Sequence, residues 1–435
     1  MIAAQVPAPP GFSPLVFLLQ IGVLLLLALV MGRLAVRLGM PAVVGELCSG
    51  ILLGPSILAQ ALPSVSAWLF PADPQQSAVL DGVGQLAVLL LVAVAGAHLD
   101  LGMVRRQGAT VAKVSLLGLV IPLGLGVAVG FLLPLSLLSP AREQVVFALF
   151  LGVAMCVSAI PVIAKTLLDM KLIHRDFGQL TLTAGVLDDV FGWLMLSVVS
   201  AMATTGVRAG TVLTSVATLL AVVLFAFTLG RPLVKGCFRL AARSGEAGPT
   251  VATTVVLVVL AAAGTQALGL EAVFGAFLCG VLVSEYGRPD PARLAPLRVL
   301  VMSMLAPIFF ATAGLRIDLT ELARPPVLLA ALLILAVAIA GKFAGAYLGA
   351  RFSGLSSWEG LALGAGLNAR GVIEILIAMI GLRLGVLNTA AYTIIVLVAV
   401  ITSLMAPPIL RLAARRIEQT EAERRRLDRR FTHSA

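Results

Sequence analysis

Charged residues are scarce in this 435-residue chain: Asp, Glu, Lys and Arg make up 12% of it, roughly half of their share in soluble domains. Hydrophobic residues make up 60% of the chain, and no globular core buries that much apolar surface. The scarcity of charge therefore excludes a soluble protein, and it predicts an integral membrane protein.

Cysteine and histidine are also scarce, with four and three copies. The cysteines are scattered, without a CxxC pair or a neighbouring histidine, so we expect neither disulfides nor a thiol metal site. No glycine-rich phosphate loop follows an expected strand, and we expect no cofactor. Residues 1–13 carry no basic side chain, which argues against a cleaved signal peptide.

Long apolar segments fill most of the chain. Cut at charges, glycine and proline, they give thirteen segments long enough to cross a bilayer as helices. The expected spans are approximately 14–33, 41–60, 79–100, 109–134, 144–168, 177–200, 209–230, 250–266, 269–286, 296–315, 326–350, 357–381 and 388–410. We therefore expect an all-α integral membrane protein with about 13 transmembrane helices in residues 1–410, followed by a short basic cytoplasmic tail at 411–435.

The basic residues predict the orientation. With the N-terminus outside, 24 of the 31 basic residues fall on the inner side and 5 on the outer side, while Lys342 and Arg370 lie within spans. Because short cytoplasmic segments are enriched in Lys and Arg, we expect a multi-pass protein of an inner or plasma membrane with its C-terminus in the cytoplasm. The net charge of +10 then reflects the basic residues that mark the cytoplasmic side of the membrane, and we expect no nucleic acid partner.

The chain contains an internal repeat. The third span ends in AVAGAHLDL at 93–101 and the tenth in ATAGLRIDL at 311–319, which agree at five of nine positions. The second and ninth spans share a glutamate followed by spaced glycines, at Glu46 and Glu271. Spans that are seven apart cross in opposite directions, so spans 2–6 and 9–13 form an inverted repeat. Such repeats are typical of secondary transporters with a binding site at the membrane midplane.

Two helix-breaking segments fall in equivalent spans of the repeat. Span five contains Ser158-Ala-Ile-Pro161, and span twelve contains the glycine-rich segment 364–371 with Asn368. Irregular backbone at this depth is tolerated only where it faces protein or water. We therefore expect two broken helices that cross at the site.

Three ionisable residues lie deep in expected spans, where each costs ~2.5–3.5 kcal/mol on insertion scales. Asp188 and Asp189 are adjacent at the centre of span six, so their side chains point about 100° apart on a helix and meet different partners. Lys342 lies in span eleven, although only five basic residues of the chain are lysines. A buried lysine exchanges its proton far more readily than an arginine, which favours a functional residue over one that snorkels to the surface.

Other polar residues leave alternatives open. Arg370 and Glu374 are four residues apart on span twelve. At this spacing they form either a structural ion pair or a gate. Glu46 lies near a span end. It either lines a funnel that leads to the site or occupies an interfacial position at the end of its helix. Ser158 supplies an oxygen to an ion or bonds to its own backbone.

A single unpaired aspartate at the midplane holds either a proton or a desolvated cation, because both compete for the same oxygens. Hard oxygen ligands without thiols or histidines favour Na⁺ or K⁺ over a transition metal. The pattern predicts a secondary active transporter that exchanges a monovalent cation for H⁺ by alternating access. The adjacent aspartates argue against an intramembrane aspartyl protease, whose two aspartates lie on separate helices, and we expect no enzyme.

These residues resemble the monovalent cation:proton antiporter-2 family, whose members have a sodium/hydrogen exchanger-like transmembrane domain. The resemblance extends along nearly the whole membrane region and is strongest for the double aspartate with the later lysine. The matching motifs are Pro41-x3-Gly45-Glu46, Ser158-Ala-Ile-Pro161, Asp188-Asp189-x2-Gly192-Trp193, Gly275-x4-Gly280, Pro307-Ile-Phe-Phe310, Lys342 and Asn368-x-Arg370-Gly371-x2-Glu374.

The resemblance implies a sodium/proton antiporter fold that forms homodimers. It implies a dimerisation part at approximately 14–100 and 250–315, and a core at 109–200 and 326–410 that moves like an elevator. Asp189 resembles the residue that carries the cation and the proton, and Asp188 the aspartate paired with Lys342.

Two departures from the family pattern bear on the transported ion. Kef-type potassium efflux proteins carry Gln-Asp in place of Asp188-Asp189 and a nucleotide-binding domain after the membrane part, and neither is expected here. The segment Asn-Ala-Arg-Gly at 368–371 is closer to plant-type cation/H⁺ exchangers, which leaves Na⁺ and K⁺ both open. The alternatives are a proton-coupled exporter of an organic solute and a Kef-like potassium efflux protein.

Overall fold

The regular elements of the protein are all helices in the described part of the chain, which confirms the all-α prediction. The computed structural model describes residues 13–71, 73–97, 108–133, 143–159, 174–206, 209–243, 245–421 and 423, together with 162, 163, 166, 167, 170 and 172. Within these residues, ten helices are long and apolar enough to cross a membrane.

The described helices differ from the thirteen expected spans at several places. The fifth span contains the 13-residue helix α8 (Gln144–Cys156), which is followed by the non-helical residues 157–159. The ninth contains α14 (Ala272–Leu282) and the π-helical turn η3 (Val283–Gly287). The twelfth is two helices, as its glycine-rich centre predicts: α18 (Ser357–Leu367) and α19 (Val372–Arg383).

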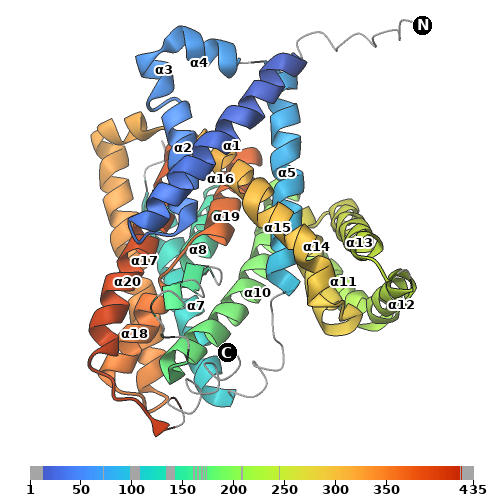
Figure 1. The fold of residues 1–435 in the computed structure, drawn as a ribbon. Coiled ribbons are helices and arrows are strands. Elements are labelled where there is room, and N and C mark those ends of the chain that lie inside the picture. The colour runs from blue at the N-terminus through green and yellow to red at the C-terminus, as the bar shows by residue number, and fades with distance from the viewer. Residues whose placement is uncertain are drawn as a thin grey trace, which may run out of the picture. The chain divides into compact units, whose positions relative to one another are not determined.

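By its contacts the chain divides into two compact units, which are described separately. The first unit comprises residues 1–97, 226–263 and 275–320, and the second 98–225, 264–274 and 321–435. The helices of the first unit are α1 (Pro14–Arg37), α2 (Ala42–Leu53), α3 (Leu58–Ala61), α4 (Pro63–Leu69), α5 (Pro74–Ala97), η2 (Ala226–Gly230), α12 (Arg231–Ala242), most of α13 (Ala247–Ala267) and of α14, η3, α15 (Pro291–Leu300), η4 (Val301–Leu305) and α16 (Ala306–Gly314) (Figure 1).

Small residues allow the helices of the first unit to pack closely. The helix α2 packs against both α1 and α16. Gly50 of α2 and Gly314 of α16 face each other, and a Cβ atom on either would collide with the backbone of the opposite helix. Such contacts are typical of membrane helices, because lipid provides no hydrophobic force that drives helices together and close van der Waals packing takes its place. The third expected span differs in position, since α5 begins at Pro74 and not at 79.

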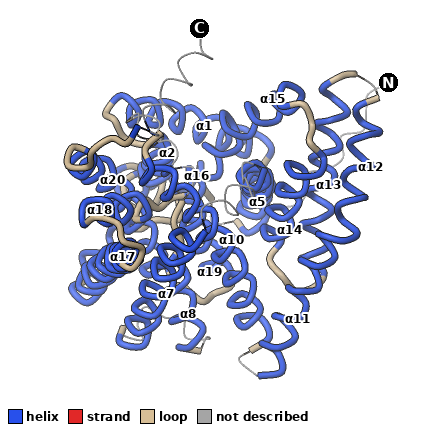
Figure 2. Tube along the Cα trace, turned by 90° about the horizontal axis from the view of Figure 1, so that it is seen from below, coloured by secondary structure: helices blue, strands red, loops and turns tan. Residues whose placement is uncertain are grey.

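The second unit contains the remaining helices. They are α7 (Gly108–Leu132), α8, α10 (Asp176–Thr205), α11 (Ala209–Phe225), most of the 3-10 helix η5 (Leu319–Ala323), α17 (Pro325–Arg351), α18, α19 and α20 (Thr389–Ala414). Within this unit α7 packs against α17 and α8, and α18 packs against α17 and α20 (Figure 2). Gly345 of α17 lies against the backbone of Leu117 and Gly118 in α7, where no larger side chain fits.

Polar caps define several helix ends of the second unit. Ser356 and Glu359 form a reciprocal capping box at the start of α18, which satisfies backbone N–H groups that have no partner inside the helix. The Asn388 side chain accepts from Ala391 N at 2.9 Å at the start of α20. These caps fix where the helices begin and hence the register of the residues that they carry.

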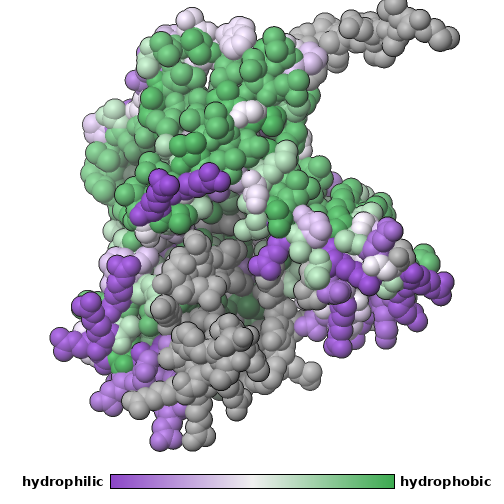
Figure 3. Space-filling model, in the orientation of Figure 1, coloured by the Kyte–Doolittle hydropathy of each residue, from purple (hydrophilic) through white to green (hydrophobic). Residues whose placement is uncertain are grey.

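The outer faces of many helices are apolar. Leu18 of α1 is 67% exposed and Leu329 of α17 is equally exposed at 67%. Figure 3 shows this hydrophobic surface over α1 and its neighbours, with hydrophilic residues gathered over α12. Apolar surface of this extent on a helix faces lipid in a membrane protein, in agreement with the composition.

The residues after α20 pack against the start of α10. Arg175 is 4% exposed and Glu423 is 2% exposed, and the Arg175 Nε donates to Glu423 Oε2 at 3.0 Å. Glu423 Oε1 also accepts from Asp176 N at 2.6 Å. Arg175 Nη2 donates to the carbonyls of Ile417 and Glu418 at 2.8 and 3.1 Å. The first part of the tail is therefore bound to the N-terminal end of the helix that carries Asp188 and Asp189.

Replacing Glu423 with glutamine is expected to lower the free energy of unfolding by about 2 kcal/mol, because hydrogen bonds to charged groups contribute ~1.5–3 kcal/mol. Thermal unfolding of the purified protein in detergent measures the change. Glu418→Gln is the matched control, since it makes the same change in an exposed side chain of the same segment. An equal loss in both variants would contradict the prediction.

Candidate functional site

The two interrupted helical segments of the second unit meet each other. The helix α8 ends at Cys156, and α18 ends at Leu367 before α19 begins at Val372. Between these ends, the backbone N–H of Ala159 donates to the carbonyl of Ala369 at 3.0 Å. A hydrogen bond between the two non-helical segments satisfies backbone groups that a membrane interior leaves without water.

Asp188 of α10 lies beside these segments and is fully buried, with 0% exposure. Its Oδ2 atom accepts from Lys342 Nζ at 2.6 Å and lies 2.6 Å from Ser158 Oγ. Its Oδ1 atom accepts from Ser115 Oγ of α7 at 3.2 Å. The carboxylate is thus surrounded by one cation and two hydroxyl groups, which together compensate its negative charge.

Lys342 is also fully buried, at 0% exposure, so it does not snorkel to the surface. Besides Asp188, its Nζ donates to the carbonyls of Gly118 at 3.0 Å and of Cys156 at 2.6 Å. An ammonium group has three donors, and each has an acceptor here. Lys342 therefore joins α17 to α7, α8 and α10.

The C-terminal end of α8 is capped by two cations. Arg370 Nη1 donates to Ala154 O at 2.9 Å, and Arg370 Nη2 donates to Met155 O at 2.7 Å. Lys342 binds the next carbonyl, that of Cys156. The last carbonyls of a helix have no partner inside it and carry its negative dipole end. These two cations supply the hydrogen-bond donors and the positive charge that a short helix ending inside the membrane requires.

Arg370 also forms the pair expected with Glu374. Its Nη1 lies 3.2 Å from Glu374 Oε1, and both side chains are buried, at 0% and 2% exposure. Ser403 of α20 donates to the backbone carbonyl of Arg370. These contacts hold the start of α19 and the end of α8 together.

Asp189 differs from its neighbour. It is 2% exposed, and its Oδ1 atom has no hydrogen-bond partner among the described residues. Asn368 is 1% exposed, and neither polar atom of its side chain has a partner in this part of the chain. Binding of a proton or a cation would compensate a buried carboxylate oxygen that has no other partner, which makes Asp189 a candidate ion site.

The structure therefore brings most of the expected residues into one unit, with two exceptions. Ser158, Asp188, Asp189, Lys342, Asn368, Arg370 and Glu374 all belong to the second unit. Glu46 lies in α2 of the first unit and is 9% exposed. Pro161, like Asp100 of the repeat, lies outside the described residues.

Sequence reasoning missed Ser115 and Ser403, and it did not anticipate that Arg370 caps α8. A lone serine in an apolar helix ordinarily bonds to its own backbone, so neither serine carried a signal. The arginine did carry one, because a cation next to a helix break is suited to cap carbonyls.

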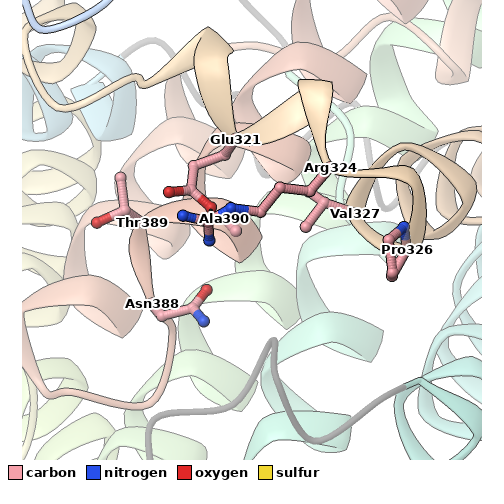
Figure 4. Close-up of a pocket in the computed structure, with 7 residues that line it drawn as sticks. All are labelled: Glu321, Arg324, Pro326, Val327, Asn388, Thr389 and Ala390. Carbon is pink, nitrogen blue, oxygen red and sulfur yellow. Dashed lines mark hydrogen bonds and ion pairs between the residues drawn. The ribbon is translucent and has the colours of Figure 1, made fainter.

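A separate cavity of about 520 Å³ lies at the beginnings of α17 and α20 (Figure 4). It is lined by Glu321, Arg324, Pro326, Val327, Asn388, Thr389 and Ala390. The side chains of Glu321 and Arg324 point toward each other and form an ion pair at 2.8 Å. None of the residues around Asp188 lines this cavity, so the two are distinct features of the unit.

Known proteins resemble this chain along most of its length. The family described as "Sodium/hydrogen exchanger, transmembrane" matches residues 23–416. The Na⁺/H⁺ antiporter NhaS4 of Synechocystis sp. is 32% identical over 402 residues, which cover 91% of this chain and 96% of that protein. Cation/H⁺ antiporter 17 of Arabidopsis thaliana is 30% identical over 90% of this chain, and the match covers 48% of that protein, so the chain spans about half the length of this plant relative.

A solved structure shares the fold. The sodium proton antiporter MjNhaP1 from Methanocaldococcus jannaschii superposes with a TM-score of 0.65 at 17% sequence identity, over 92% of this chain and 98% of that one. The likeness confirms an all-helical membrane protein of the antiporter fold. Membership of a transporter family also confirms the prediction that the chain is not an enzyme. This chain is a multi-pass membrane protein that belongs to the sodium/hydrogen exchanger transmembrane family of cation/proton antiporters.

Proposed function

We propose that this protein exchanges a monovalent cation, Na⁺ or K⁺, for H⁺ by alternating access, with Asp189 as the shared binding residue. The observation that carries the proposal is the contrast between the two adjacent aspartates. Asp188 is compensated by Lys342, Ser158 and Ser115, whereas Asp189, at 2% exposure, has one oxygen without a partner among the described residues. One negative charge in that setting requires one positive charge, and a proton or a cation supplies it.

The meeting of the two interrupted segments supports the same proposal. Half-helices that end beside a buried carboxylate place dipole ends and free backbone groups at the ion path. In our proposal α8 and the pair α18 and α19 are the cores of two crossing broken helices, within thirteen spans arranged as the inverted repeat. The bond from Ala159 to Ala369 and the cations on α8 support this arrangement.

The division of the chain into two units supports a moving core. We assign the transporting core to the second unit, which carries the buried charges of Asp188, Asp189, Lys342, Arg370 and Glu374, and a dimerisation role to the first unit. The protein then functions as a homodimer with the N-terminus outside and the basic tail in the cytoplasm. The excess of basic residues on the expected inner side supports this orientation.

The test is proton movement in everted membrane vesicles that report pH through a dye. A transmembrane proton gradient is formed, and Li⁺, Na⁺, K⁺ and Rb⁺ are then added singly. We expect at least one of these cations to dissipate the gradient in vesicles with the protein and none to do so in vesicles without it. Failure of all four cations would contradict the proposal and favour a proton-coupled exporter of an organic solute.

A further inference from the structure

The chain has only two asparagines, and their surroundings are opposite. Asn388 caps α20 through its side-chain oxygen, at 2.9 Å from Ala391 N, and lines the cavity shown in Figure 4. Asn368 is 1% exposed, and its Oδ1 and Nδ2 atoms both lack a partner among the described residues. One asparagine therefore has a structural explanation in its contacts, and the other has none.

The side chain of Asn368 is costly where it lies. Burying an amide without hydrogen bonds costs roughly 2–7 kcal/mol by transfer measurements. The end of α18 does not require this side chain, because the backbone N–H of Asn368 already binds Gly364 O at 2.9 Å. Alanine would end the helix without the desolvation cost. No described residue accounts for the amide, whereas an ion or a water molecule bound there would.

The position of Asn368 points to the cation. The preceding residue, Leu367, has its carbonyl 2.7 Å from Ser158 Oγ, and the same hydroxyl lies 2.6 Å from Asp188 Oδ2. One hydroxyl group therefore separates the end of α18 from the aspartate that precedes Asp189. Asn368 also lies at the C-terminal end of α18, where the helix dipole is negative and attracts cations.

We propose that Asn368 is a neutral ligand of the transported cation, with its Oδ1 atom binding the ion whose charge Asp189 neutralises; this inference rests on the antiport function proposed above. Amide and carboxylate oxygens together are hard ligands suited to Na⁺ and K⁺. Water that accompanies the ion accepts from Nδ2. A proton on Asp189 needs no such ligand, so Asn368 acts on the cation step and not on the proton step.

The first experiment compares Asn368→Ala with Asn388→Ala in the vesicle assay. Asn368→Ala is expected to raise the half-saturating cation concentration at least about tenfold, which corresponds to about 1.4 kcal/mol, while the maximal rate stays near that of the unmodified protein. The preference among Li⁺, Na⁺, K⁺ and Rb⁺ is expected to change as well. Asn388→Ala is expected to leave both quantities unchanged. A fall in maximal rate alone, equal for all four cations, would show a structural role and overturn the inference.

A second experiment does not depend on an Asn368 variant that folds. Labelling with ¹⁵N-asparagine gives two side-chain amide signals, and Asn388→Ala assigns them by removing one. Titration with the cation that dissipates the gradient is expected to shift the Asn368 signal and not that of Asn388. The shift is expected to disappear in Asp189→Ala. An Asn368 signal that stays fixed at saturating cation, or one that shifts equally in Asp189→Ala, would overturn the inference.

Failure of this inference is distinguishable from failure of the proposed function. If no cation moves protons, or if Asp189→Ala exchanges normally, the antiport mechanism itself is wrong. If exchange is cation-driven and requires Asp189 while the half-saturating concentration in Asn368→Ala and the Asn368 signal are unaffected, only the inference about Asn368 is wrong.

Discussion

Replacement of Asp189 with asparagine is expected to abolish cation-driven proton movement. The amide has nearly the shape of the carboxylate, but it carries no charge and binds no proton at physiological pH. The native carboxylate is 2% exposed and its Oδ1 atom has no partner in the described part of the chain, so in the proposed mechanism it needs a positive charge, and the exchange of that charge is the transport reaction. In the everted-vesicle assay the gradient should remain intact when Na⁺ or K⁺ is added.

The matched control is Asp290→Asn. Asp290 is exposed and caps α15 by accepting from Ala292 N at 3.0 Å, and asparagine caps a helix as well as aspartate does. Exchange is expected to be unchanged in this variant. Full exchange by a well-expressed Asp189→Asn protein would refute the assignment of Asp189 as the ion-carrying residue.

The contrast between Asp188 and Asp189 shows how far sequence reasoning reaches. Adjacent positions on a helix require different surroundings, so the sequence alone predicted two roles. The family resemblance paired Asp188 with Lys342, and the physical basis of that pairing is the set of partners at residue 115 of α7, residue 158 after α8 and residue 342 of α17. Those partners are far apart along the chain, and a pattern in one segment contains no information about them.

The helix breaks show the same limit. The glycine-rich segment 364–371 predicted an interruption in span twelve, and the structure has one at 368–371. Local sequence also marked residues 158–161, where the structure describes non-helical backbone up to residue 159. That the two segments bind each other, and that Arg370 caps the helix of the other segment, are tertiary facts. Local propensity predicts where a helix ends, and packing determines what satisfies its end.

The second large effect is expected at Lys342. Replacing it with methionine keeps most of the side-chain volume but removes the cation from a site with 0% exposure. Of its described partners Asp188 then retains the two serine hydroxyls, and the carbonyls of Gly118 and Cys156 lose the Lys342 donor. Breaking a buried ion pair on one side costs about 3–5 kcal/mol, so Lys342→Met is expected to unfold at a markedly lower temperature in detergent.

A double variant separates the effect of leaving Asp188 without its cation from the effect of changing the shape of the side chain at position 342. Asp188→Asn with Lys342→Met removes both charges of the pair, so neither is left without the other, and the double variant is expected to recover a large part of the lost stability, because replacing both partners of a buried pair is often nearly neutral. Asp189 is still present, so cations should still move protons in vesicles. If the pair contributes a second proton to the cycle, currents on a solid-supported membrane will fall while dye-reported exchange persists. A double variant as unstable as Lys342→Met would instead show that Lys342 stabilises the protein chiefly through its hydrogen bonds to the carbonyls of Cys156, at the end of α8, and of Gly118, in α7.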